Sequence, residues 1–189
     1  MSRAYRVTVS ESARRLIHAT DEVSTSLGLL EILPREEMAA LLEAELIRNG
    51  FRKDGDLLRR DTDDAAIVVN PTNGNVTVRA DSQDNVSLRS RKEAVAFEDI
   101  GPSERSVRRQ LHKRAKEDLS EQAAEQQAKL QQQATEKLER HLRDLTPELN
   151  RAVNRVTADA LKKKAAHMGR IKDIQDNVES GSLTITVEV

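Results

Sequence analysis

The chain of 189 residues contains no cysteine and no tryptophan, with one tyrosine and two phenylalanines. Without thiols it forms no disulfide, zinc ribbon, iron–sulfur cluster or thiol-based active site. Aromatic residues amount to 2% of the chain, too few for the stacked aromatic platforms with which many proteins hold nucleic-acid bases. Any core must therefore be built from leucine, isoleucine, valine and alanine.

Long apolar runs and a strong net charge are also missing. No stretch reaches the roughly 18 apolar residues of a membrane-spanning helix, and residues 1–9 alternate polar and apolar positions, unlike a signal peptide. These features predict a soluble, cytoplasmic protein. The formal net charge is -1 at pH 7, so the chain lacks the overall positive charge of a dedicated nucleic-acid-binding protein.

The residues that carry most enzyme chemistry are few and poorly spaced. No two of the four histidines have the spacing of metal ligands on one predicted element. Five aspartates between residues 54 and 64 do not match a calcium-binding loop, because Gly55 separates the first two and no glutamate closes the loop. Nucleotide-binding and zinc-protease motifs are absent as well. The sequence therefore predicts a non-enzymatic protein with no catalytic residue, metal or cofactor.

The first hundred residues predict a mostly antiparallel sheet with one packed helix. Residues 5–9 alternate as in a half-buried strand, and residues 14–19 suggest a second extended run. The helix is expected from Pro34 to Asn49, because it has a proline in its first turn and a glycine after its end. Further extended runs are expected at 51–58, 65–69, 76–78 and 86–88, with the turn at Asn73-Gly74 joining two of them.

From Pro102 onward the pattern is helical. Thr146 and Pro147 are residue types that cap and begin a helix, so two helices are expected, ending at Leu145 and near Gly169. Apolar residues at heptad-like spacing predict that they fold into a coiled-coil-like helical hairpin. Residues 120–135 contain six glutamines and one large apolar residue, so the hairpin is expected to project as an arm, with a disordered linker as the alternative.

The end of the chain predicts two more strands, joined by a turn at Ser180-Gly181. The predicted fold class is α+β. Its three parts are an α+β sheet domain at 1–101, a helical hairpin arm at 102–169, and a C-terminal β-hairpin at 170–189 that completes the sheet domain.

A basic stripe early in the helical region is the candidate partner-binding site. Residues 105–116 contain six basic residues and no acidic one. Four of them share one helical face: Arg105, Arg109, Lys113 and Lys116. Cations near a helix N-terminus oppose the helix dipole, so helix stability does not account for them. The stripe predicts docking to an acidic partner or a phosphate backbone, and an ordinary solvated face is the alternative.

Both ends of the chain resemble the small accessory proteins of bacterial FtsH ternary systems. The similar stretches are S-R-A-Y-R-V-T-V-S-E-S from Ser2, L-G-L-L-E-I-L-P from Leu27, E-L-I-R-N-G-F to Phe51, N-R-V-T-A-D-A-L-K-K-K-A from Asn154 and G-S-L-T-I-T-V-E-V from Gly181. The resemblance implies an uncharacterised domain encoded beside AAA+ ATPases and von Willebrand A-type proteins, in prokaryotic conflict or stress response, without assigned catalytic residues.

Together these features predict a non-enzymatic accessory or adaptor protein. Its expected partner is a protein, such as an AAA+ ATPase or a von Willebrand A-type protein, with a homo-oligomer through the helical arm as a compatible arrangement. The alternative is nucleic-acid association through residues 105–116 and 162–164, whose affinity would fall steeply with salt.

Overall fold

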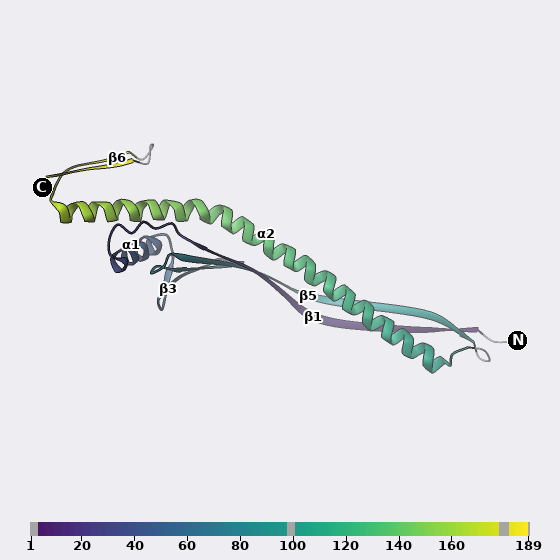
Figure 1. The fold of residues 1–189 in the computed structure, drawn as a ribbon. Coiled ribbons are helices and arrows are strands. Elements are labelled where there is room, and N and C mark those ends of the chain that lie inside the picture. Colours follow the sequence, from purple (N-terminus) through teal and green to yellow (C-terminus); the bar gives the residue numbers. More distant parts are fainter. Residues whose placement is uncertain (1–3, 98–100, 178–181, 189) are drawn as a thin grey trace. The chain divides into compact units, whose positions relative to one another are not determined.

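The structure is a computed structural model that describes residues 4–97, 101–177 and 182–188. The elements in chain order are β1 (Ala4–Ser26), α1 (Arg35–Arg48), β2 (Arg52–Asp54), β3 (Leu57–Asp61), β4 (Ala65–Asn70), β5 (Asn75–Phe97), α2 (Glu104–Met168), β6 (Arg170–Asn177) and β7 (Ser182–Glu188) (Figure 1). Five strands form one sheet in the order β1-β5-β4-β3-β2, and β6 pairs with β7. Mixed helix and strand content with an antiparallel sheet confirms the predicted fold class.

The long strands β1 and β5 are neighbours in the sheet. The Leu27 N–H donates to the Gly74 carbonyl at 2.8 Å, and the Thr20 hydroxyl donates to Asp81 at 2.7 Å. Because residue numbers fall on β5 as they rise on β1, this pair is antiparallel. The separate strands predicted at 5–9 and 14–19 are wrong, since both belong to β1. No glycine or proline interrupts residues 4–26, so nothing local ends the strand.

The described residues divide into two compact units. The first unit contains the described residues within Met1–Asp21 and Asp81–Glu136. The second unit contains the described residues within Glu22–Ala80 and Lys137–Val189. In the first unit, α2 packs on one face of the ribbon formed by β1 and β5. Two small apolar clusters join them, one of Val7, Val9, Ala96, Val107, Leu111 and Ala115, the other of Ile17, Ala19 and Leu130.

The glutamine-rich part of α2 also lies against this ribbon. Gln127 and Gln131 donate hydrogen bonds of 3.1 Å to the backbone carbonyls of His18 and Thr20, on the outer edge of β1. The distance from Gln127 to Gln131 along the helix matches the distance from His18 to Thr20 along the strand. Four helical residues rise about 6 Å, and two strand residues rise about 6.6 Å. The predicted projecting arm is therefore wrong for this segment: the glutamines satisfy strand-edge carbonyls that would otherwise face solvent.

The second unit holds the larger apolar core. Buried side chains come from α1, from β3 to β5 and from α2, and the largest fully buried ones are Leu42, Leu46, Leu58, Ile67, Val69, Val76, Val78 and Val156. Glu45 on α1 is 2% exposed in the same region. Its Oε1 accepts a hydrogen bond of 2.9 Å from Arg155 of α2, which links the two helices.

Residues 104–168 form a single helix, so the helical hairpin predicted to fold at Thr146 is wrong. Pro147 lies inside the helix, and the Thr146 hydroxyl donates to the Leu142 carbonyl at 2.7 Å instead of capping a new helix. A proline inside a helix costs about 3 kcal/mol. Leu145 and Leu149, on either side of it, are buried in one apolar cluster, and their burial offsets that cost.

Local signals place α1 correctly. Asn49 is its C-cap, the Gly50 N–H donates to the Ile47 carbonyl, and the Phe51 N–H donates to the Leu46 carbonyl. These two bonds form a Schellman motif. Gly50 has φ 87, which a residue with a side chain rarely adopts. The predicted turn at Asn73-Gly74 is confirmed too, since it joins β4 to β5 in register from Asn70–Asn75 to Ala65–Ala80.

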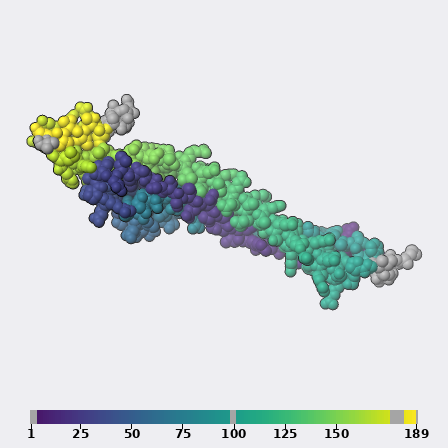
Figure 2. Space-filling view, in the orientation of Figure 1, coloured from purple at the N-terminus to yellow at the C-terminus, as the bar shows by residue number. Residues whose placement is uncertain are grey.

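The C-terminal strands form the predicted β-hairpin, with Ile174 opposite Ile185. Their predicted closure of the main sheet is wrong, because β6 and β7 make a separate two-stranded sheet. They lie next to the end of α2, in yellow in Figure 2. A Cβ added to Gly169 would lie 2.3 Å from the Glu188 carbonyl oxygen, so this close approach requires glycine. The turn predicted at Ser180-Gly181 lies outside the described residues.

Candidate binding surface

The four residues of the predicted basic stripe lie in the first unit, on the part of α2 drawn in teal (Figure 2). Arg105, Arg109, Lys113 and Lys116 are all exposed, and Val107, Leu111 and Ala115 are buried against the strands. Lys113 lies 3.9 Å from Glu117. The other three make no ion pair with any residue that the structure describes. The predicted helix face is thus present and open, and nothing in the structure tests whether it binds a partner.

The fold adds basic residues from β1 and β5 that the sequence pattern did not bring together. The same apolar cluster that holds the start of α2 includes Val7 and Val9 of β1 and Ala96 of β5. Within the first unit, residues 4–16, 85–97 and 104–116 carry twelve cations and three anions. The cations are Arg6, Arg14, Arg15, Arg89, Arg91, Lys92, Arg105, Arg108, Arg109, Lys113, Arg114 and Lys116, and the anions are Glu11, Glu93 and Glu104. We call these twelve cations the basic surface. Arg6, Arg14, Arg89 and Arg91 alternate along their strands with residues buried against α2, so they lie on the face of the ribbon away from that helix.

Part of this charge is neutralised within the first unit. Glu93 lies 2.8 Å from Arg91 and 3.7 Å from Arg6. Arg108 pairs with Glu104 at 3.0 Å, and Lys92 pairs with Asp118 at 3.2 Å. Seven of the twelve cations have no ion pair within residues 4–97, 101–177 and 182–188: Arg14, Arg15, Arg89, Arg105, Arg109, Arg114 and Lys116. Uncompensated charge of one sign attracts and orients an oppositely charged partner.

A hollow of about 380 Å³ opens on the ribbon within this surface. Its lining residues come from both strands: Arg14, Arg15, Leu16, Asn85, Val86 and Ser87. Leu16 is 64% exposed, so an apolar side chain borders the hollow beside two arginines. An apolar contact flanked by cations suits a protein surface that presents an apolar side chain among carboxylates.

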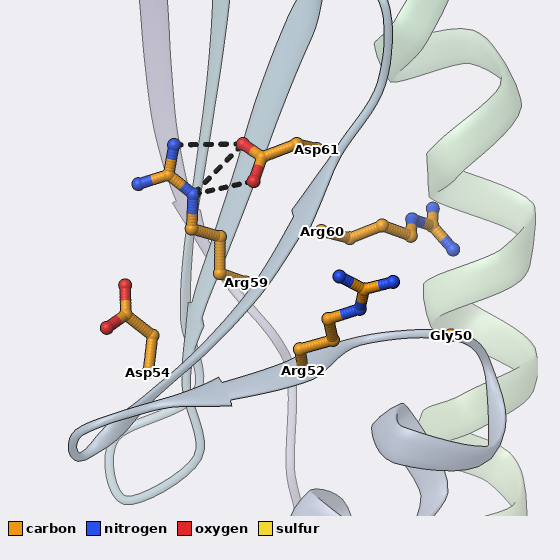
Figure 3. A pocket seen from close by; sticks show the side chains of 6 residues that line it. All are labelled: Gly50, Arg52, Asp54, Arg59, Arg60 and Asp61. Carbon is orange, nitrogen blue, oxygen red and sulfur yellow. Dashed lines mark hydrogen bonds and ion pairs between the residues drawn. The ribbon is translucent and has the colours of Figure 1, made fainter.

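A second hollow, of about 300 Å³, lies in the second unit at the edge of the main sheet (Figure 3). The Nε of Arg59 lies 2.9 Å from both carboxylate oxygens of Asp61, which lowers the pKa of that aspartate. Arg60 donates to both carboxylate oxygens of Glu148, at 2.6 and 2.9 Å, and covers the Phe51 ring. Both of these guanidinium groups are therefore held in structural contacts. Arg52 and Asp54 also line the hollow, so its three arginines are balanced by Asp54, Asp61 and Glu148.

The structure adds little in favour of enzyme chemistry. Three histidines each lie beside one carboxylate: His141 with Asp64 at 2.7 Å, His112 with Glu11 at 2.7 Å and His18 with Asp81 at 3.3 Å. Among the described residues, no group of three histidine, aspartate or glutamate side chains is placed to hold a metal ion. Within the same residues, no helix is both long and apolar enough to cross a membrane.

Comparison with known proteins gives one match. A family model described as FtsH ternary system domain X5 matches residues 1–189. The chain belongs to this family. Membership confirms the resemblance found at the two ends of the sequence, extends it through the glutamine-rich middle, and agrees with an accessory role in FtsH ternary systems. No curated protein and no solved structure matches the chain.

Proposed function

We propose that this FtsH ternary system domain X5 protein is a non-enzymatic adaptor that binds a protein partner through its basic surface. The observation that carries the proposal is the excess of twelve cations over three anions in three segments of the first unit, with the exposed Arg14, Leu16 and Arg89 on the ribbon face away from α2. The partner we propose is the AAA+ ATPase or the von Willebrand A-type protein of the same system. Family membership supports a protein partner, because the family is associated with FtsH ternary systems.

The unpaired cations would provide orientation and speed of association more than raw affinity. An exposed ion pair contributes about 0.2–1 kcal/mol, so several are needed for a stable complex. Leu16 would contribute further stability when a partner side chain covers it, at about 25 cal/mol per Å² of apolar surface. We therefore expect the partner surface to be acidic, with an apolar residue at its centre that fits the hollow beside Arg14 and Arg15.

Nucleic acid is the second candidate ligand, because phosphate groups are attracted to the same cations. The two candidate ligands differ in whether they bury Leu16. A phosphate backbone gains little from an exposed leucine, whereas a protein partner buries it. Replacing Leu16 by serine should therefore weaken a protein complex and leave nucleic-acid binding unchanged.

The test uses the purified full chain and the two purified proteins of its system, treated with nuclease. The variant Arg14→Glu/Arg89→Glu changes two exposed arginines of the basic surface. The control Lys163→Glu/Lys164→Glu makes the same charge change at exposed positions of the second unit. We expect the first variant to lose at least about tenfold in affinity for one of the proteins, which is about 1.4 kcal/mol, and the control to keep it.

Two results would overturn the adaptor proposal. In one, neither protein binds the native chain at low salt. In the other, the variant and the control lose affinity equally, which shows a general charge effect. Binding of DNA or RNA that disappears only in the arginine variant would assign the basic surface to the second candidate.

A further inference from the structure

Charged residues on the exposed side of α2 follow one another at intervals of four. The series runs Arg105, Arg109, Lys113, Glu117, Glu121 and Glu125, three cations followed by three anions, and all six are exposed. Among the described residues, Lys113 and Glu117 are the only two members of this series that pair with each other, at 3.9 Å. We call this series the charged ridge.

The charged ridge lies opposite the buried side of the helix. Its midpoint is level with Ala115, whose side chain is buried against the strands. With 3.6 residues per turn, a point midway between Lys113 and Glu117 on the ridge is about 180° around the helix from Ala115. The ridge is therefore presented outward and leaves the contacts of the first unit undisturbed.

Residues four apart form a ridge inclined about 26° to the helix axis, and the ridges of two helices align when the axes cross at about −50°. Along the ridge the charges run from three cations to three anions, and in the opposite direction they run from three anions to three cations. When two such ridges align antiparallel, every cation meets an anion. When they align in parallel, every residue meets its own kind, which is unfavourable.

We propose that two copies of the chain associate through the charged ridge, antiparallel, about a twofold axis level with Ala115. Lys113 then faces Glu117 of the second copy and Arg109 faces Glu121, whereas Arg105 and Glu125 lie about 100° around the helix from the midpoint, at the margin of the contact. Symmetry repeats each contact, as in any isologous dimer. This interface goes beyond the adaptor function and leaves Arg14, Arg89 and Lys116 free for a partner.

The test exploits the separation of the two signs along the helix. One variant replaces the three cations by glutamate, Arg105→Glu/Arg109→Glu/Lys113→Glu, and the other replaces the three anions by lysine, Glu117→Lys/Glu121→Lys/Glu125→Lys. Sedimentation equilibrium at low salt gives the dissociation constant of each protein alone and of the mixture. Each variant alone should associate at least about tenfold more weakly than the native chain, since repulsion replaces every ion pair. The equimolar mixture should recover native-like association as a heterodimer.

Other outcomes overturn the proposal. They are a native chain that stays monomeric at low salt up to about 1 mM, a variant that associates as the native chain does, and a mixture that fails to associate although both variants keep native helix content. The variant Arg14→Glu/Arg89→Glu leaves the charged ridge unchanged, so its partner binding and its self-association report on the two proposals separately.

Chemical cross-linking tests the register. Because the chain has no cysteine, the single variants Arg109→Cys and Glu121→Cys each introduce one thiol. A short bis-maleimide should join the two variants to each other in a mixture and should join neither to itself. Self-linking of either variant would show a different register and would overturn the proposed axis.

Discussion

Replacing Arg155 by alanine should destabilise the second unit, because it removes the partner of a buried carboxylate. Glu45 is 2% exposed, and its Oε1 accepts a hydrogen bond of 2.9 Å from Arg155. Its Oε2 lies 3.3 Å from Arg48 but accepts no hydrogen bond. Breaking a fully buried pair costs about 3–5 kcal/mol. The Arg155 side chain is 65% exposed, and Arg48 remains beside Glu45. We therefore expect Arg155→Ala to lower the free energy of unfolding by about 1–3 kcal/mol.

Replacing Glu45 itself should change the free energy of unfolding in the opposite direction. The variant Glu45→Met keeps a similar volume and removes the cost of holding a charge away from water. We expect its free energy of unfolding to equal that of the native chain or to exceed it by up to about 2 kcal/mol. In the Glu45→Met background, Arg155→Ala should cost less than about 0.5 kcal/mol, since no buried charge is left unpaired.

Urea unfolding at pH 7, followed by far-ultraviolet circular dichroism, measures all four states of this double-mutant cycle. Arg143→Ala is the matched control, because Arg143 is an exposed arginine of α2 in the same unit. The reasoning is refuted if Arg155→Ala costs no more than Arg143→Ala. It is equally refuted if the two changes at Glu45 and Arg155 add, which would show that the contact carries no coupling energy.

Three further predictions concern stability. Pro147→Ala should raise the free energy of unfolding by about 1–3 kcal/mol, because it restores a helical N–H without disturbing the core, and a lower urea midpoint would contradict this. Gln131→Ala should cost about 0.5–1 kcal/mol for its lost bond to β1, whereas Gln133→Ala, at an exposed position, should cost little in the same assay. The hydrogen bond from His141 lowers the pKa of Asp64, so this carboxylate stabilises the fold above about pH 4 and loses that effect as the pH falls through its lowered pKa. The difference in urea midpoint between the native chain and Asp64→Asn, present at pH 6, should therefore shrink toward pH 3.

Elements whose boundaries depend on local chemistry could be predicted from the sequence. The helix α1 ends where Asn49 and Gly50 provide a Schellman motif, and the turn at Asn73-Gly74 is closed by residues within the turn. Both signals lie within a few residues of the structure they determine. Tertiary contacts do not overturn them, because the preference for glycine at Gly50 follows from its backbone conformation alone.

The errors arose where distant contacts outweigh a local rule. Pro147 favours a helix break locally, yet Leu145 and Leu149 are buried in one core on either side of it. The sequence of the glutamine-rich segment predicts exposure to solvent, because its partners do not lie nearby in the chain. Gln127 and Gln131 bind strand carbonyls more than 100 positions away. Charge spacing along the chain indicates only the cations of α2, because Arg14 and Arg89 are brought near each other by the pairing of β1 with β5.

The division of α2 into an inner and an outer side determines how its variants can be interpreted. In the first unit, the buried residues Val107, Leu111 and Ala115 contact the strands, whereas the charged ridge makes no contact with β1 or β5 among the described interactions. Changes on the ridge should therefore alter association and lower stability only by about 0.2–0.5 kcal/mol for each pair of like charges four residues apart. Changes at Leu111 should lower stability through lost packing and leave the ridge charges in place. If the glutamate and lysine ridge variants keep the native urea midpoint while losing self-association, the loss belongs to the interface and not to the fold.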